Sequence, residues 1–132
     1  KRDYIMKADQ LNGANLAYIG DAYFELSIRK YLLSRGITDQ NELHNRAVRY
    51  VSAKSHNLIA GSILDVLTDD EKQIFKRGRN YKYRSHRNLN RGEYLNSSGF
   101  EAVIGYLYLE EKRDRLDFLI DKAIELIEER HE

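Results

Sequence analysis

Two stretches of the sequence combine apolar and small residues with a single carboxylate, an arrangement that suits a metal site. Asp21 is the one charged residue in residues 16–24, and Glu101 is the one charged residue in residues 100–109. A helix that is apolar on all sides belongs in the centre of a protein. A carboxylate is costly there unless it is paired, hydrogen-bonded or bound to a metal. Two acids on different central helices would provide the hard oxygen ligands that Mg²⁺ prefers.

For either acid taken alone, an ion pair with an arginine or a helix cap is the simpler explanation. Because the pattern occurs twice, the metal site and the ion pair both stay open. Gly20 and Gly105 lie near the acids and would let two helices, or a backbone and a ligand, approach closely. Glu25 shares a helix face with Asp21, but we expect it to pair with Arg29, four residues later.

A basic segment lies between these stretches. Residues 72–92 contain eight Lys or Arg and no acid, so the segment carries +8; the whole chain carries +1, and the remainder therefore −7. Clustered cations bind nucleic-acid phosphates, and interleaved tyrosines leave both single strands and duplexes open as partners. A solvated loop without a ligand is the alternative. The expected nucleic-acid contacts are Lys76, Arg77, Arg79, Lys82, Arg84 and Arg87.

The four histidines show no spacing typical of metal ligands. We expect His86, inside the basic segment, to contact phosphate. His44, His56 and His131 are expected to be surface or packing residues.

Apolar residues recur at helical spacing and no strand alternation stands out, which predicts an all-α fold of five to seven helices. The first helix is expected over residues 16–33, with Asn15 as its N-cap and Gly36 just after its end. Thr38 or Asp39 is expected to cap the second helix.

Beyond the second helix, the sequence leaves open whether residues 52–55 break or continue the helical run. Thr68 and Glu71 have the spacing of a capping box, which predicts a short helix that ends near Gly78.

Residues 78–97 show no apolar period and are expected to form a loop, which at this length in a small domain is usually functional or disordered. Ser97 or Ser98 is expected to cap a helix that reaches about Lys112. A final amphipathic helix is expected over residues 116–127.

The composition limits the fold and the chemistry. A chain of 132 residues is expected to form one domain. The absence of Cys excludes disulfides, thiol nucleophiles and cysteine-based zinc sites, and the absence of Pro, with only 8 Gly, disfavours a β-sandwich. No apolar run has the length of a membrane span and no leader is visible, so we expect a cytoplasmic protein. The first residue is Lys rather than Met, which indicates a trimmed or incomplete chain.

The two acid-bearing stretches resemble motifs of the ribonuclease III family. Residues 16–25 are similar to its signature helix, whose core is Leu-Gly-Asp-Ala, and residues 100–109 are similar to its second motif, Glu-Ala-x-x-Gly-x-x-Tyr-Leu. Residues 51–55 and 76–80 resemble the Mini-ribonuclease III branch, which has the nuclease domain without a double-stranded-RNA-binding domain. The resemblance covers about residues 11–126.

This resemblance implies one ribonuclease III-like nuclease domain over residues 1–132, an all-α bundle with a basic loop at about residues 76–97. It implies a homodimer with an RNA groove across the interface, and hydrolysis of double-stranded RNA that leaves 5′-phosphate and 3′-hydroxyl ends. Asp21 and Glu101 match the catalytic residues that hold Mg²⁺, for which Mn²⁺ substitutes, without a small-molecule cofactor. Ribosomal RNA precursors are the substrate implied for the Mini branch.

Two positions depart from the full-length enzymes of that family. Ala17 stands where they carry a glutamate, and Ser98 stands where they carry an aspartate. The Mini branch is similarly sparse, so these departures favour a single Mg²⁺ and do not argue against activity. A non-catalytic RNA-binding or ribosome-assembly module is the alternative function, but it gives no reason for the two acids. An all-α nucleotide hydrolase would need a Glu-x-x-Glu helix before residues 111–114, and none precedes them.

Overall fold

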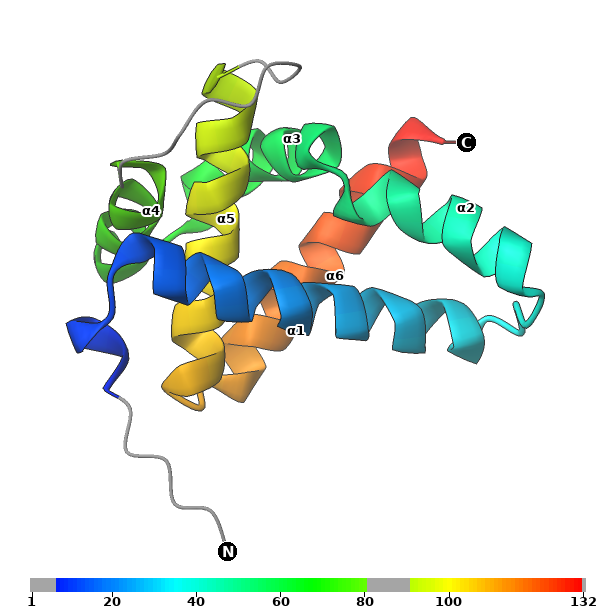
Figure 1. Ribbon diagram of the computed structural model, residues 1–132, viewed down its shortest axis with the longest axis horizontal. Coiled ribbons are helices and arrows are strands. Elements are labelled where there is room, and N and C mark those ends of the chain that lie inside the picture. The colour runs from blue at the N-terminus through cyan, green and yellow to red at the C-terminus, as the bar shows by residue number, and fades with distance from the viewer. Residues whose placement is uncertain (1–6, 81–90, 132) are drawn as a thin grey trace, which may run out of the picture.

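Figure 1 presents the computed structural model of the chain, which describes residues 7–80 and 91–131. Within these residues the protein is a bundle of helices without a strand, so the predicted all-α fold of five to seven helices is confirmed. None of the described helices is both long and apolar enough to cross a membrane. In chain order the helices are the 3-10 helix η1 (Ala8–Gln10), α1 (Gly13–Ser34), α2 (Gln40–Val51), α3 (Ala53–Ile63), the 3-10 helix η2 (Leu64–Val66), α4 (Asp69–Asn80), α5 (Arg91–Leu109) and α6 (Arg113–Arg130).

The helix α5 is the centre of the bundle. It packs against α1, α3 and α4, and Figure 1 shows it (yellow) crossing α1 (blue). Its buried side includes Phe100, which contacts Phe24 of α1 edge-on with ring centroids 5.2 Å apart. The expectation that residues 100–109 form a central helix is therefore confirmed.

Two glycines set the distance between α1 and α5. A Cβ added to Gly20 would lie 1.7 Å from the backbone oxygen of Glu101, and one added to Gly105 would lie 1.9 Å from the backbone oxygen of Leu16. Neither position has room for a side chain, so the two backbones approach as the sequence predicted. The crossing places the N-terminal half of α1 directly against the C-terminal half of α5.

The predicted loop over residues 78–97 is wrong at both of its ends. The helix α4 continues to Asn80 and α5 already begins at Arg91, while residues 81–90 lie outside the described part of the chain. Ser97 and Ser98 are therefore buried inside α5 rather than at its N-terminus. Gly78 and Ser98, which are typical of loops, lie instead where α4 packs against α5. A Cβ on Gly78 would lie 2.8 Å from the backbone oxygen of Ser98, so the two helices approach closely there.

The structure confirms three predicted helix ends, whereas the helix expected to reach about Lys112 ends at Leu109. Thr68 and Glu71 form the reciprocal capping box, since the Thr68 amide donates to Glu71 Oε1 at 3.0 Å and the Glu71 amide donates to Thr68 Oγ1 at 3.2 Å. Asp39 caps α2 by accepting from the Glu42 amide at 3.0 Å. Gly36 follows the end of α1 with a φ of 85°, a conformation that favours glycine.

The structure corrects one predicted helix cap and settles one boundary that the sequence left open. The N-cap of α1 is Asn12, which accepts from the Asn15 amide at 2.8 Å, so the prediction of Asn15 as the cap is wrong. Ser52 separates α2 from α3, because its extended backbone ends one helix and its hydroxyl accepts from the Ser55 amide at the start of the next. The helical run is thus interrupted at Ser52.

Candidate metal centre

Three potential metal ligands from three helices meet where α1 crosses α5. Asp21 of α1, His56 of α3 and Glu101 of α5 each offer one ligand atom, and these atoms all lie within 4.8 Å of one another. The two acids are 80 positions apart in the sequence, and the structure brings them together as the paired apolar stretches predicted. No pattern in the sequence predicted that the imidazole of His56 would join the two acids.

The cluster has a buried side and an open side. His56 is completely buried, and the side chain of Glu101 is 19% exposed. Asp21 is exposed, so the prediction that α1 is buried on all sides is wrong. One face of α1 is open to solvent along its length, as Tyr18 at 80% and Leu26 at 54% exposure illustrate. The open face gives a dissolved ligand access to the acids.

Glu101 is held by two neighbours through the same oxygen. Its Oε2 lies 2.7 Å from His56 Nδ1 and accepts from Ser97 Oγ at 3.2 Å. The His56 ring is wedged edge-on between two phenylalanines, with centroids 5.0 Å from Phe24 and 5.2 Å from Phe100. The carboxylate of Glu101 therefore has a defined orientation.

The pKa of Asp21 is raised above its usual range. Partial loss of hydration against the protein surface is the largest cause, even though the side chain is open to solvent. The negative charges of Glu101 and Glu25 raise it further, and His56 acts in the opposite direction. Two acids that repel each other at a solvent-facing site are chemically suited to share a cation.

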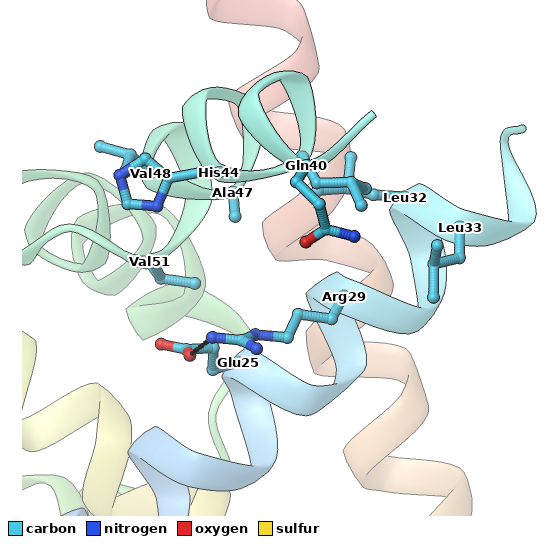
Figure 2. Close-up of a pocket in the computed structure, with 10 residues that line it drawn as sticks. Glu25, Arg29, Leu32, Leu33, Gln40, His44, Ala47, Val48 and Val51 are labelled. Carbon is cyan, nitrogen blue, oxygen red and sulfur yellow. Dashed lines mark hydrogen bonds and ion pairs between the residues drawn. The ribbon is translucent and has the colours of Figure 1, made fainter. Parts of the chain in front are cut away.

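Glu25 lies outside this cluster. It forms an ion pair with Arg29 at 2.6 Å, so the predicted pairing along α1 is confirmed. Figure 2 shows the pair in a pocket of about 420 Å³ between α1 and α2, whose other walls include Leu33 and Val48. None of the three clustered ligands lines this pocket, and its walls are mostly apolar, whereas the cluster is polar.

Of the six predicted nucleic-acid contacts, three lie in the described part of the chain, on the last turns of α4. Lys76 is exposed. Arg77 is also exposed, and its guanidinium donates to the backbone oxygens of Asp9 at 3.2 Å and Leu11 at 3.1 Å. The remaining three, Lys82, Arg84 and Arg87, and also His86, Tyr81 and Tyr83, lie outside the described residues.

Arg79 connects the basic end of α4 to the helices that carry the cluster. Its Nε donates to Asn96 Oδ1 at 2.9 Å, and Asn96 Nδ2 donates to Asn57 Oδ1 at 2.8 Å. Asn57 follows His56 on α3, and Asn96 precedes Ser97 on α5. The basic end of α4 and the cluster are therefore neighbours.

Sequence reasoning missed two residues of the site. His56 was expected to be a surface or packing residue, and no local pattern links it to an acid 45 positions away. Ser97 was expected only as a possible N-cap, and its role one turn before Glu101 follows from the start of α5 at Arg91.

Comparison with known families gives a match to the Ribonuclease III domain over residues 14–112. The match includes Asp21, His56 and Glu101. It covers most of the chain, including the crossing of α1 and α5.

Several relatives match nearly the full chain. A Mini-ribonuclease 3 from Enterococcus faecalis is 42% identical over 134 residues, which is 99% of this chain and 98% of that protein. One from Staphylococcus aureus is 40% identical over 123 residues, covering 91% of this chain and 92% of that protein. A crystal structure of a protein from Fusobacterium nucleatum superposes with a TM-score of 0.80 at 34% identity, covering 88% of this chain and 93% of that one.

Proposed function

The chain belongs to the ribonuclease III family and is a double-strand-specific endoribonuclease; on that premise, we propose that it uses Mg²⁺ held by Asp21 and Glu101 and leaves 5′-phosphate and 3′-hydroxyl ends. The observation that carries the proposal is the meeting of these two acids, from helices distant in sequence, at the solvent-facing side of one cluster. Residues 1–132 act as one nuclease domain in this proposal.

The residues at the cluster fit a divalent cation. Carboxylate oxygens are the ligands that Mg²⁺ and Mn²⁺ favour. The mutual repulsion of Asp21 and Glu101, which raises the pKa of Asp21, would be relieved by a bound cation. With two acids and no third carboxylate among the clustered ligands, a single ion is the expected stoichiometry.

Each part of the site has a distinct task in this mechanism. Asp21 and Glu101 would hold the Mg²⁺, which would supply Lewis-acid activation of the attacking water and charge stabilisation at the scissile phosphate. Asp21 reaches the solvent side, where the phosphate would lie, and Glu101 is fixed from beneath by His56 and Ser97. The exposed cations of the basic segment neutralise backbone phosphates on either side of the cut.

Duplex RNA would be recognised by its shape, its phosphates and its 2′-hydroxyls. Lys76, Arg77 and Arg79 lie at the end of α4, and Arg79 donates to Asn96, the neighbour of Ser97 on α5, so this end of the helix is close to the cluster. Together with Lys82, Arg84 and Arg87 they form the proposed RNA contact. The natural substrate in this proposal is a ribosomal RNA precursor in the cytoplasm.

We also propose that the active form is a homodimer. Large apolar side chains are exposed on α1 and on the helices beside it, where a second copy would cover them. A groove of about 550 Å³ runs between α1 and α6, adding concave surface to that face. The exposed side chains are Tyr18, Leu26, Leu33, Val48, Tyr108 and Phe118.

Incubation with a long RNA duplex and with its two separated strands, each with and without Mg²⁺, tests this function. We expect cleavage of the duplex alone, and only when Mg²⁺ or Mn²⁺ is present. End analysis should give 5′-phosphate and 3′-hydroxyl termini. Binding of the duplex without cleavage at any metal concentration would instead favour a non-catalytic RNA-binding module.

A further inference from the structure

The two ring nitrogens of His56 have very different surroundings. Nδ1 lies 2.7 Å from Glu101 Oε2, whereas Nε2 is buried and meets no hydrogen-bonding group among the described residues. A buried N–H without an acceptor is more costly than a buried lone pair. A ring proton therefore belongs on Nδ1, from which it is donated to the carboxylate.

Ser97 reinforces this contact from within α5. Its hydroxyl lies one helical turn before Glu101 and donates to the same Oε2 at 3.2 Å. No side chain in the described ranges donates to Oε1 of Glu101. Both donors thus occupy one oxygen of the carboxylate and leave the other available to a ligand.

We propose that His56 and Ser97 are positioning residues, which hold Glu101 Oε2 so that Oε1 is presented to the metal ion beside Asp21. This inference rests on the proposed metal-dependent nuclease function. Groups that hydrogen-bond to a metal ligand fix its orientation, and their loss typically weakens metal binding by about 10- to 100-fold.

His56 acts through Glu101 rather than as a ligand. Its ring is fully buried between Phe24 and Phe100, on the closed side of the cluster, while Asp21 is on the open side. Imidazole is also a poor choice for Mg²⁺, which prefers oxygen. The hydrogen bond to Glu101 leaves Nδ1 no free lone pair for a metal.

Metal binding to the RNA-free protein tests the assignment, with Mn²⁺ as the probe in a paramagnetic-resonance titration. His56→Leu removes the donor, and we expect it to weaken Mn²⁺ binding by about tenfold or more. His56→Asn places an amide N–H near the position of Nδ1 and should restore affinity to within about threefold of wild type. Ser97→Ala, which keeps the stronger donor, should weaken binding by about threefold.

Ile59→Ala is the matched control for the loss of a large buried side chain from α3. Ile59 is fully buried one turn beyond His56, so its truncation lowers stability while both hydrogen-bond donors to Glu101 stay in place. We expect wild-type Mn²⁺ affinity for this variant. Equal weakening by Ile59→Ala and His56→Leu would mean that the effect is structural, and would overturn the assignment.

Three other results would also overturn it. These are wild-type Mn²⁺ affinity in a folded His56→Leu protein, equal loss in His56→Asn and His56→Leu, and an unprotonated His56 Nδ1 in the ¹⁵N spectrum of labelled histidines. The spectrum needs no variant and decides the matter if His56→Leu does not fold. Failure of the nuclease function would be distinct: the wild type would then bind Mn²⁺ at Glu101 yet cleave no duplex.

Discussion

Gly20 and Gly105 oppose each other where α1 crosses α5, so closely that a Cβ on either would press into the backbone of the other helix. Asp21 directly follows the first glycine, and Glu101 lies one turn before the second. The spacing of the two carboxylates therefore depends on positions that carry no side chain. Stability and the proposed metal site are linked at this crossing.

Gly105→Ala should destabilise the protein by about 3 kcal/mol, because the added methyl group would meet the backbone oxygen of Leu16 at 1.9 Å and force the helices apart. Chemical denaturation measures this loss. Gly61→Ala in α3 is the control, since its Cβ would meet no atom within 4 Å. The control should be neutral or stabilising by up to about 1 kcal/mol, as expected for a helical glycine. A stable Gly105→Ala protein would contradict the close crossing.

Asp21→Asn and Glu101→Gln should each lower the rate of duplex cleavage by more than about 100-fold, since losing metal-based stabilisation of the transition state costs several kcal/mol. Duplex binding, measured without metal by fluorescence anisotropy, should stay within about threefold of wild type because the phosphate contacts come from the basic segment. Glu25→Gln is the matched control, since Glu25 pairs with Arg29 outside the cluster. Retained cleavage in either acid variant would remove that residue from the catalytic role.

Arg77→Ala and Arg79→Ala should each reduce the salt dependence of RNA binding by about one unit of slope, as expected when one phosphate contact is lost. Binding constants measured across a series of salt concentrations give the slope. Arg77 also donates to two backbone oxygens before α1, so a melting curve must accompany its measurement. Arg46→Ala is the control with an unchanged slope, because Arg46 pairs with Glu42 on α2, a helix that lies away from α4 in Figure 1.

Asp21→Asn should stabilise the metal-free protein at pH 7. The pKa of Asp21 is raised in the folded state, so folding favours the protonated carboxyl, and the ionised form lowers stability at neutral pH. The gain should be below about 1 kcal/mol because solvent screens this exposed charge. It should shrink as the pH falls through the raised pKa and vanish below the ordinary value of 3.8.

Saturating Mg²⁺ should reverse that order of stability, because a ligand that binds only the folded state stabilises the wild type and not the variant. Melting temperatures of both proteins, with and without Mg²⁺ at pH 7 and pH 4, show which protein is more stable under each condition. A wild type more stable than Asp21→Asn without any metal would contradict the electrostatic cost assigned to this carboxylate.

The pattern of residues along the chain was enough to predict the helical fold and the two acids. Apolar residues at helical spacing and a reciprocal pair such as Thr68 and Glu71 act within one or two turns, so their effect is visible locally. The role of Gly20 and Gly105 was also predictable, since a glycine inside an apolar helix indicates that another backbone approaches closely there. The motifs around Asp21 and Glu101 then indicated the family.

The tertiary structure decided what depends on other parts of the chain. Ser98 and Gly78 look like loop residues in isolation, and only the contact between α4 and α5 makes their small size a packing feature. Asp21 is exposed because nothing in the described chain covers that face of α1. His56 reaches Glu101 from 45 positions away, a relationship that no local spacing encodes, because a hydrogen bond between helices is fixed by how they pack.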